Sequence, residues 1–187
     1  NKIGGKAKAM IVTSSREHAV RYKNAIDQYL EDHEYDDLKA LVAFSGSIEV
    51  DGIEYTEPRM NDGIKESELP SKFDTSEYQV LVVAEKYQTG FDQPLLHTMY
   101  VDKKLSGVQA VQTLGRLNRT HPGKEDTFVL DFKNDEEDIY EAFQPFYERT
   151  TVEETSDPQH IYQLESELNA FQVYTQQEVD KFAEAFF

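Results

Sequence analysis

The sequence predicts an α/β protein built on a doubly wound, mostly parallel β-sheet, with a short helical extension at its C-terminal end. Short continuous apolar runs, which are typical of strands buried on both faces, alternate with segments whose apolar residues recur at helical spacing. Polar residues and glycines directly follow several of these runs. Because such sheets bind their ligands at the carboxyl ends of the strands, these residues form the predicted site.

Composition limits the classes of function. The 187 residues suffice for one sizeable core, and the lack of Cys excludes disulfides and thiolate sites. No apolar run approaches membrane-spanning length, so we expect a cytoplasmic protein without a membrane partner. The net charge of −17 argues against non-specific nucleic-acid binding by the whole surface. Residues 134–187 hold 14 acidic residues against two basic ones, however, so a local basic face remains compatible with residues 1–133.

The strands and helices are expected in a regular order. Apolar runs predict strands at residues 8–13, 39–44, 80–84, 98–102 and 127–132. Ser14 and Glu17 have the spacing of a capping box and begin a predicted amphipathic helix, and Ser106 and Gln109 begin another. Residues 136–147 also read as helical. The polar, turn-rich residues 47–65 are predicted to be a surface excursion with no clear contribution to the core.

A change of composition near residues 150–158 predicts a domain boundary. We expect one domain over residues 1–150 and, over residues 151–187, the start of a helical subdomain with two helices. Because the chain begins with Asn rather than Met, we also expect it to be a fragment of a longer protein.

The most informative segment of the sequence runs from Gln112 through Gly115 and Arg116 to Arg119. No acidic residue occurs from Lys103 to Lys124. Residues three apart share a helix face, so both arginines can point at one target, and their planar donors suit phosphate oxygens. A solvated basic helix end would show the same pattern.

Two further groups lie at predicted strand ends. Ser14, Ser15 and Arg16 would place hydroxyl groups, backbone N–H groups and a cation at a helix N-terminus, where they could contact phosphate or simply cap the helix. Thr89-Gly90-Phe91-Asp92 could let the backbone approach a ligand closely at Gly90, with Asp92 accepting from a ribose hydroxyl, or it could be an ordinary turn. Ser45, at the end of the second strand, is a weaker candidate.

Taken in order, these segments resemble the second RecA-like motor domain of superfamily 2 helicases and translocases. Residues 112–119 match that family's motif VI, residues 89–92 resemble motif V, and residues 10–16 resemble motif IV. The longer segments 91–105 and 116–124, together with residues 43–46, are similar to the restriction (R) subunit of type I restriction enzymes. The resemblance extends over residues 6–150.

The resemblance implies an ATP site shared with a preceding RecA-like domain, which would bind most of the ATP and Mg²⁺. Arg119 and Arg116 would act as arginine fingers, and Gln112 would position the γ-phosphate. Gly90, Asp92 and Gly115 would line the nucleotide. The DNA backbone would be contacted by Ser14, Ser15, Arg16, Ser45 and Thr89. Asn118 and Thr89 depart from residues common in helicases, which puts the usual roles of these two positions in doubt.

The function implied is part of an ATP-driven translocase on double-stranded DNA. Its partners would be the nuclease domain of the same subunit and the methyltransferase and specificity subunits of the complex, and the fragment alone would be inactive. A different class remains open, a non-catalytic RecA-like module that docks nucleic acid or protein. A metal-dependent nuclease centre, from Asp92 and the segment Asp102-Lys103-Lys104, is a third reading, and it predicts Mg²⁺-dependent cleavage by residues 1–187 alone.

Overall fold

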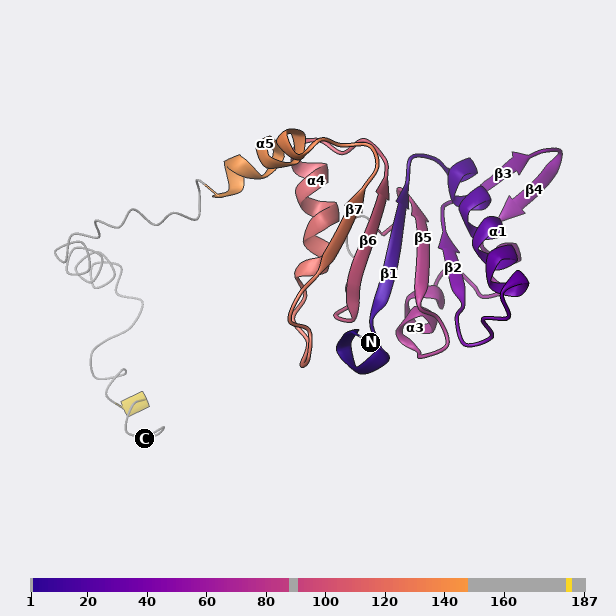
Figure 1. The fold of residues 1–187 in the computed structure, drawn as a ribbon, viewed down its shortest axis with the longest axis horizontal. Helices are drawn as coiled ribbons and strands as arrows, with labels where there is room; N and C mark the ends of the chain where they lie inside the picture. Colours follow the sequence, from indigo (N-terminus) through magenta and orange to yellow (C-terminus); the bar gives the residue numbers. More distant parts are fainter. Residues whose placement is uncertain (1, 88–90, 148–180, 183–187) are drawn as a thin grey trace. The chain divides into compact units, whose positions relative to one another are not determined.

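A computed structural model describes residues 2–87, 91–147 and 181–182, and it confirms the predicted parallel α/β fold. Five strands form one sheet in the order β2-β5-β1-β6-β7, and every pairing between neighbours is parallel (Figure 1). The strands are β1 (Lys8–Thr13), β2 (Ala40–Ala43), β5 (Val80–Ala84), β6 (Leu96–Asp102) and β7 (Phe128–Asp131). Each falls on a predicted run, with β6 beginning two residues earlier than expected.

Both faces of the sheet are covered at β1, β2 and β5, because alternate residues of these strands enter two separate cores, whereas β7 is largely exposed. On β5, Leu81 and Val83 belong to the larger core, whereas Val82 and Ala84 belong to the smaller one. The larger core packs under α3 (Leu69–Asp74), α4 (Gly107–Leu114) and α5 (Glu136–Tyr147), and the smaller one under α1 (Arg16–Asp32). This two-sided burial explains why the strands are apolar without alternation.

The connections between the strands indicate where the sheet would form a crevice for a ligand. The chain leaves β1 through α1 toward β2 on one side, and leaves β6 through α4 toward β7 on the other. The carboxyl ends of β1 and β6 therefore flank the point where the winding reverses, which is where open α/β sheets form a crevice. Tyr22 of α1 spans this point by donating a hydrogen bond to Asp102 at the end of β6, at 3.0 Å.

Two predicted helix caps are corrected by the structure. Ser15, and not Ser14, is the N-cap of α1, because its hydroxyl accepts from the N–H of His18 at 3.1 Å. Ser14 instead contacts the His18 ring, with 2.5 Å between Oγ and Nδ1. Ser106 does occupy the N-cap of α4, but its side chain makes no capping hydrogen bond.

The prediction for residues 47–65 is wrong in one respect, since this segment contributes to the core. It folds into an antiparallel hairpin of β3 (Ser47–Val50) and β4 (Ile53–Thr56), followed by α2 (Glu57–Met60). Val50 joins the smaller core, and both Glu57 and Asn61 are buried. The burial of two polar side chains in a polar stretch could not be read from its hydropathy.

The chain divides into two compact units, Asn1–Pro145 and Phe146–Phe187. The predicted linker near residues 150–158 lies outside the described residues, as do nearly all of the two helices expected after it. The boundary at residue 150 therefore stays a prediction.

Candidate functional site: the carboxyl edge of the sheet

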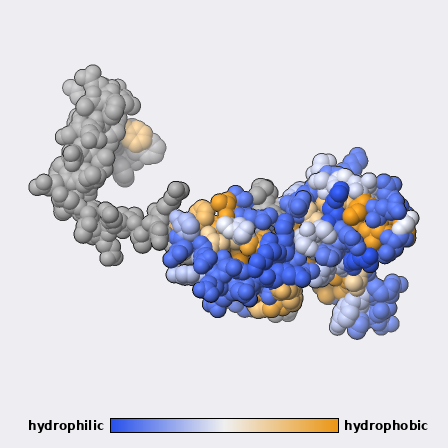
Figure 2. Space-filling model, turned by 90° about the horizontal axis from the view of Figure 1, so that it is seen from above, coloured by the Kyte–Doolittle hydropathy of each residue, from blue (hydrophilic) through white to orange (hydrophobic). Residues whose placement is uncertain are grey.

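The predicted site residues form two groups. The first contains Arg116, Arg119 and the segment between β5 and β6. It lies toward the amino end of β6, because Nζ of Lys124 donates to the carbonyl oxygens of Leu117 and Arg119 and also to that of Pro94, just before β6. The second group lies where β1, β2 and β5 end. Figure 2 views the molecule from the side of the strand ends, and hydrophilic residues cover most of the described surface there.

Arg116 and Arg119 do not belong to the α-helix on which they were predicted. Helix α4 ends at Leu114, and Arg116 lies in a short 3-10 helix, η2 (Gly115–Asn118), with Arg119 at its C-cap. Residues three apart eclipse one another in a 3-10 helix, so the tighter winding brings the two guanidinium groups to the same side.

Both arginines reach the same short segment after β5. The Nη1 atom of Arg116 donates to the carbonyl oxygen of Phe91 at 3.0 Å. The Nε atom of Arg119 lies 2.8 Å from Oδ1 of Asp92, and both side chains of this ion pair are at least half exposed. The structure thus brings both arginines to Phe91 and Asp92, two neighbouring residues of the chain itself. Their predicted contact with phosphate stays a prediction.

The other predicted members of this group are only partly described. Gln112 is exposed on α4, and Gly115 begins η2. Gly90 and Thr89 lie outside the described residues. Thr113, which sequence reasoning passed over, is fully buried beside Gln112, and its hydroxyl has no hydrogen-bond partner among the residues that the structure describes.

The second group places Arg16 beside Ser45. Arg16 is exposed and its Nη1 atom donates to the carbonyl oxygens of Ser45, at 3.2 Å, and Ser47, at 3.1 Å. Between them Gly46 has a φ of +74°, and a Cβ atom there would lie 3.5 Å from Arg16 Nη1. The glycine therefore serves the left-handed turn, since a Cβ at this distance would only be in ordinary van der Waals contact with Arg16.

A cavity of about 400 Å³ opens next to this group. Its lining comes from three strand ends: Arg16 after β1, Ser45 after β2, and Ala84, Glu85 and Lys86 at the end of β5. The cation of Arg16 and the hydroxyl of Ser45 are therefore presented together, as contact with an anionic ligand requires.

Helix α2 supplies a set of contacts that the sequence did not reveal. The carboxylate of Glu57 is fully buried and accepts from the N–H of Phe44 at 2.9 Å. One turn later, Asn61 accepts from the N–H of Val42 at 3.0 Å and donates to its carbonyl oxygen at 2.8 Å. These side chains satisfy the backbone on the outer edge of β2, which would otherwise be an unpaired sheet edge.

Glu57 also forms a buried ion pair with Lys86. The Nζ atom of Lys86 lies 2.8 and 3.0 Å from the two carboxylate oxygens of Glu57, and 2.9 Å from the exposed carboxylate of Glu66. Burial raises the pKa of Glu57 above its usual value, although Lys86 and the Phe44 N–H oppose the shift. Burial also acts to lower the pKa of Lys86. The hydrogen bonds that Lys86 donates to Glu57 and Glu66 outweigh this effect, and the pKa of Lys86 is raised.

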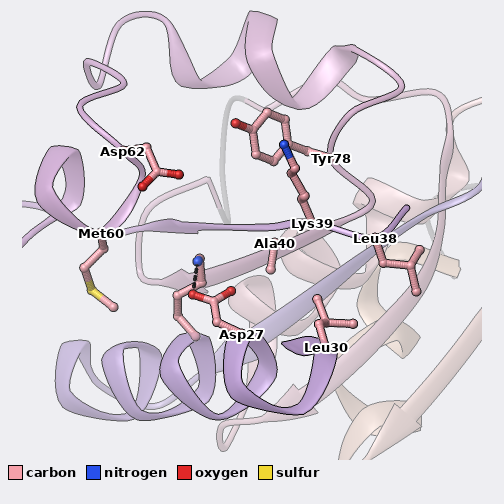
Figure 3. A pocket seen from close by; sticks show the side chains of 9 residues that line it. Asp27, Leu30, Leu38, Lys39, Ala40, Met60, Asp62 and Tyr78 are labelled. Atoms are coloured by element: carbon pink, nitrogen blue, oxygen red, sulfur yellow. Dashed lines mark hydrogen bonds and ion pairs between the residues drawn. The ribbon is translucent and has the colours of Figure 1, made fainter. Parts of the chain in front are cut away.

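A different cavity lies at the opposite edge of the sheet, near the amino end of β2. It measures about 230 Å³ and is lined by residues that include Lys23, Asp27, Lys39 and Tyr78 (Figure 3). Lys23 is buried and its ammonium is already paired with Asp27. None of the predicted site residues reaches this cavity.

Two classes of feature are missing from the part of the chain that the structure describes. No group of three or more His, Asp or Glu side chains there could hold a metal ion. In the same residues, no helix has both the length and the apolar character needed to cross a membrane.

Known proteins similar to this chain are mainly type I restriction enzymes. The family described as type I restriction enzyme subunit R domain 3 matches residues 54–134. The "Putative type I restriction enzyme MjaVIIP endonuclease subunit" of Methanocaldococcus jannaschii is 30% identical over 142 residues, which are 67% of this chain and 13% of that protein. The type I restriction enzyme HindI endonuclease subunit of Haemophilus influenzae is 29% identical over 126 residues, 63% of this chain and 12% of that protein.

Solved structures with a similar fold include a restriction enzyme and a helicase-type domain. The DNA-bound ATP-dependent type ISP restriction-modification enzyme LlaBIII matches 67% of this chain and 8% of its own, with 19% identity and a TM-score of 0.46. The C-terminal domain of the DEAD-box protein Dbp5 matches 75% of this chain and 70% of its own, with 15% identity and a TM-score of 0.44.

The range matched by the family model, residues 54–134, includes Glu57, Lys86, Asp92, Arg116 and Arg119, but not Arg16 or Ser45. The chain spans about an eighth of the length of these curated relatives, 13% and 12%. The chain is therefore a relative of the restriction (R) subunits of type I restriction enzymes, and its described part is an α/β domain with a parallel sheet.

Proposed function

We propose that this chain is the second RecA-like half of the ATP-dependent DNA translocation motor of a type I restriction enzyme. The observation that carries the proposal is that Arg116 and Arg119 both contact the Phe91–Asp92 segment. This contact holds two guanidinium groups beside the segment that links β5 to β6, where a phosphate chain bound to a preceding domain would meet them.

The two groups of the site would have different roles, one in ATP hydrolysis and the other in DNA contact. Arg119 and Arg116 would stabilise charge on the transferring phosphoryl group, with Gln112 positioning the γ-phosphate. Asp92 and Gly115, with Gly90, would line the nucleotide. ATP is the substrate in this scheme, and Mg²⁺ would be bound mainly by the preceding motor domain.

The cavity at the ends of β1, β2 and β5 would face the DNA backbone. Arg16 and Ser45 line it together, and Ser14 and Ser15 lie at the neighbouring N-terminus of α1. Contacts of this kind give salt-dependent binding that does not read sequence, as a translocase needs. Methyltransferase and specificity subunits and a nuclease domain would complete a cytoplasmic complex on double-stranded DNA.

Replacing Arg119 tests the proposal directly. In the full-length protein, Arg119→Ala should lower the rate of DNA-stimulated ATP hydrolysis about 10³-fold or more, as for arginine fingers in related phosphoryl transfer. Arg21→Ala is the matched control, because Arg21 is a half-exposed arginine paired with Glu17 on α1, outside the predicted site. A rate within a few-fold of wild type for Arg119→Ala would remove the finger role.

One observation favours a second candidate, a non-catalytic docking module. Both arginines already have partners within the chain, as they would in a domain that stabilises itself and binds no ATP. DNA-stimulated ATP hydrolysis by the full-length protein separates the two, since a docking module shows none. Residues 1–187 alone should hydrolyse no ATP under the main proposal, because half of the nucleotide site lies in another domain.

A further inference from the structure

Glu57 contacts the residues that follow two strands, β2 and β5. Its Oε2 atom accepts from the N–H of Phe44, the last buried residue before Ser45, and both of its carboxylate oxygens hold the ammonium of Lys86. Glu57 is fully buried, and the Lys86 side chain is only 17% exposed. The sides of the cavity formed by β2 and β5 are thus both fastened to the first residue of α2.

The contacts continue from Lys86 toward the arginines. Tyr87 follows Lys86 with a φ of +63°, and its ring packs on Phe91 with 4.9 Å between the ring centroids. The carbonyl oxygen of Phe91 accepts from Arg116, and the next residue, Asp92, pairs with Arg119. A continuous series of contacts therefore runs from α2, through the segment after β5, to the two arginines.

The left-handed backbone in this segment needs an anchor. Glu85 and Tyr87 both have positive φ values, at 63°, although neither is glycine. Non-glycine residues hold this conformation only where surrounding contacts impose it. The ion pair of Lys86, which lies between these two residues, is the contact that fixes the segment to the rest of the fold.

We propose that Glu57 is a positioning residue. Through Lys86 it fixes residues Glu85–Tyr87, and through the contact of Tyr87 with Phe91 it sets the place of Arg116 and Arg119 for ATP hydrolysis. This inference rests on the proposed motor function. Glu57 itself touches neither nucleotide nor DNA, because it is buried behind Phe44 and Lys86. Its effect passes through the loop after β5.

The experiment compares four variants of the full-length protein. Glu57→Gln keeps the shape and an acceptor for the Phe44 N–H, but turns an amide toward Lys86. Lys86→Met removes the ammonium, and Glu57→Gln/Lys86→Met removes both charges. Glu66→Gln is the matched control, since Glu66 also contacts Lys86 but is half exposed. Loss of one partner of a buried pair is destabilising, whereas loss of both is often tolerated.

Three quantities are measured: kcat and KM for DNA-stimulated ATP hydrolysis, the thermal midpoint, and hydrogen exchange of the amides of residues 85–92. Because a small displacement of catalytic groups can cost up to about 10²-fold in rate, Glu57→Gln should lower kcat about 10- to 100-fold, with KM for ATP within about threefold of wild type. In the double variant the thermal midpoint should return toward wild type while kcat stays low. Hydrogen exchange of the amides of residues 85–92 should be faster in Glu57→Gln and in the double variant, whereas exchange of the β6 amides should not change. Glu66→Gln should resemble wild type in these measurements.

Recovery of kcat together with the thermal midpoint in the double variant would show that Glu57 serves stability alone, and would overturn the inference. Unchanged exchange over residues 85–92 in Glu57→Gln would overturn it as well. The exchange measurement needs no ATP, so it decides the role of Glu57 even if the wild-type protein lacks DNA-stimulated ATP hydrolysis. Absence of DNA-stimulated ATP hydrolysis in the wild-type protein would instead contradict the proposed function.

Discussion

The guanidinium of Arg119 and the carboxylate of Asp92 form an ion pair, with 2.8 Å between Nε and Oδ1. The pair links the end of η2 to the segment after β5, beside the bond from Arg116 to the Phe91 carbonyl. The Arg119 side chain remains half exposed in this pair. The arginine is therefore oriented by Asp92 without being enclosed by it.

Asp92→Asn should disturb function more than stability. Both partners of the pair are at least half exposed, and exposed ion pairs contribute only about 0–1 kcal/mol. We therefore expect the free energy of unfolding, measured with urea, to change by less than about 1 kcal/mol. If Asp92 lies near the ribose as proposed, KM for ATP should rise with little change in kcat. Asp51→Asn, which removes an exposed partner of Arg21, is the control, and a loss of stability well beyond its own would contradict the expectation.

Asn61→Ala should be strongly destabilising. The Asn61 side chain both accepts from and donates to the backbone of Val42, and all of these groups are buried. Its removal leaves one N–H and one C=O without partners on the edge of β2, at a cost of about 1–3 kcal/mol for each unsatisfied group. The expected loss is therefore about 2–6 kcal/mol in urea unfolding. Exposed Asp62 offers the neighbouring control, Asp62→Ala, and equal stability of the two variants would refute the account.

These contacts of α2 also show where sequence reasoning stops. Strands such as Val80–Ala84 were predicted to the residue, because burial on both faces of a parallel sheet leaves a continuous apolar run. Glu57 and Asn61 gave no comparable signal. Their partners are backbone groups of Val42 and Phe44, and a backbone group is the same in every sequence. Only the spacing of four between Glu57 and Asn61 hints that both could face one strand.

The arginine segment lies between these two cases. The spacing of Arg116 and Arg119 predicted that they would reach one target, and the structure places both on the Phe91–Asp92 segment. The local conformation was predicted wrongly, as a continued α-helix, because Gly115 and Asn118 are weak evidence against one more helical turn. The chemical roles of these residues stay predictions, since they depend on a nucleotide and on a second domain.

Thr113→Val should stabilise the protein. The hydroxyl of Thr113 is fully buried on α4 without a hydrogen-bond partner in the part of the chain that the structure describes, whereas valine has nearly the same shape and no polar atom to desolvate. An unsatisfied buried polar group costs about 1–3 kcal/mol, so a gain of about 1 kcal/mol or more is expected in urea unfolding. Thr113→Ser keeps the hydroxyl and should show no gain. A loss of stability in Thr113→Val would mean that the hydroxyl has a partner, which in the full-length protein a ligand or another domain could provide.

Asp126→Asn should change how stability depends on pH. Asp126 pairs with Lys2 at 2.6 Å and contacts the ring of His97 at 2.9 Å, and hydrogen bonds from these two groups lower the pKa of its carboxyl. A carboxyl whose pKa is depressed by folding contributes stability above its unfolded pKa, about 3.9, and loses it as the pH falls through the folded value. The difference in stability between wild type and Asp126→Asn should therefore be largest above pH 5 or so and should shrink toward about pH 2, when urea unfolding is followed across this range. Asp138→Asn provides a comparison at a second exposed aspartate, whose pKa is lowered by its hydrogen bond to Lys104. A difference between wild type and Asp126→Asn that grows as the pH falls would show that the carboxyl is not stabilised in its charged form.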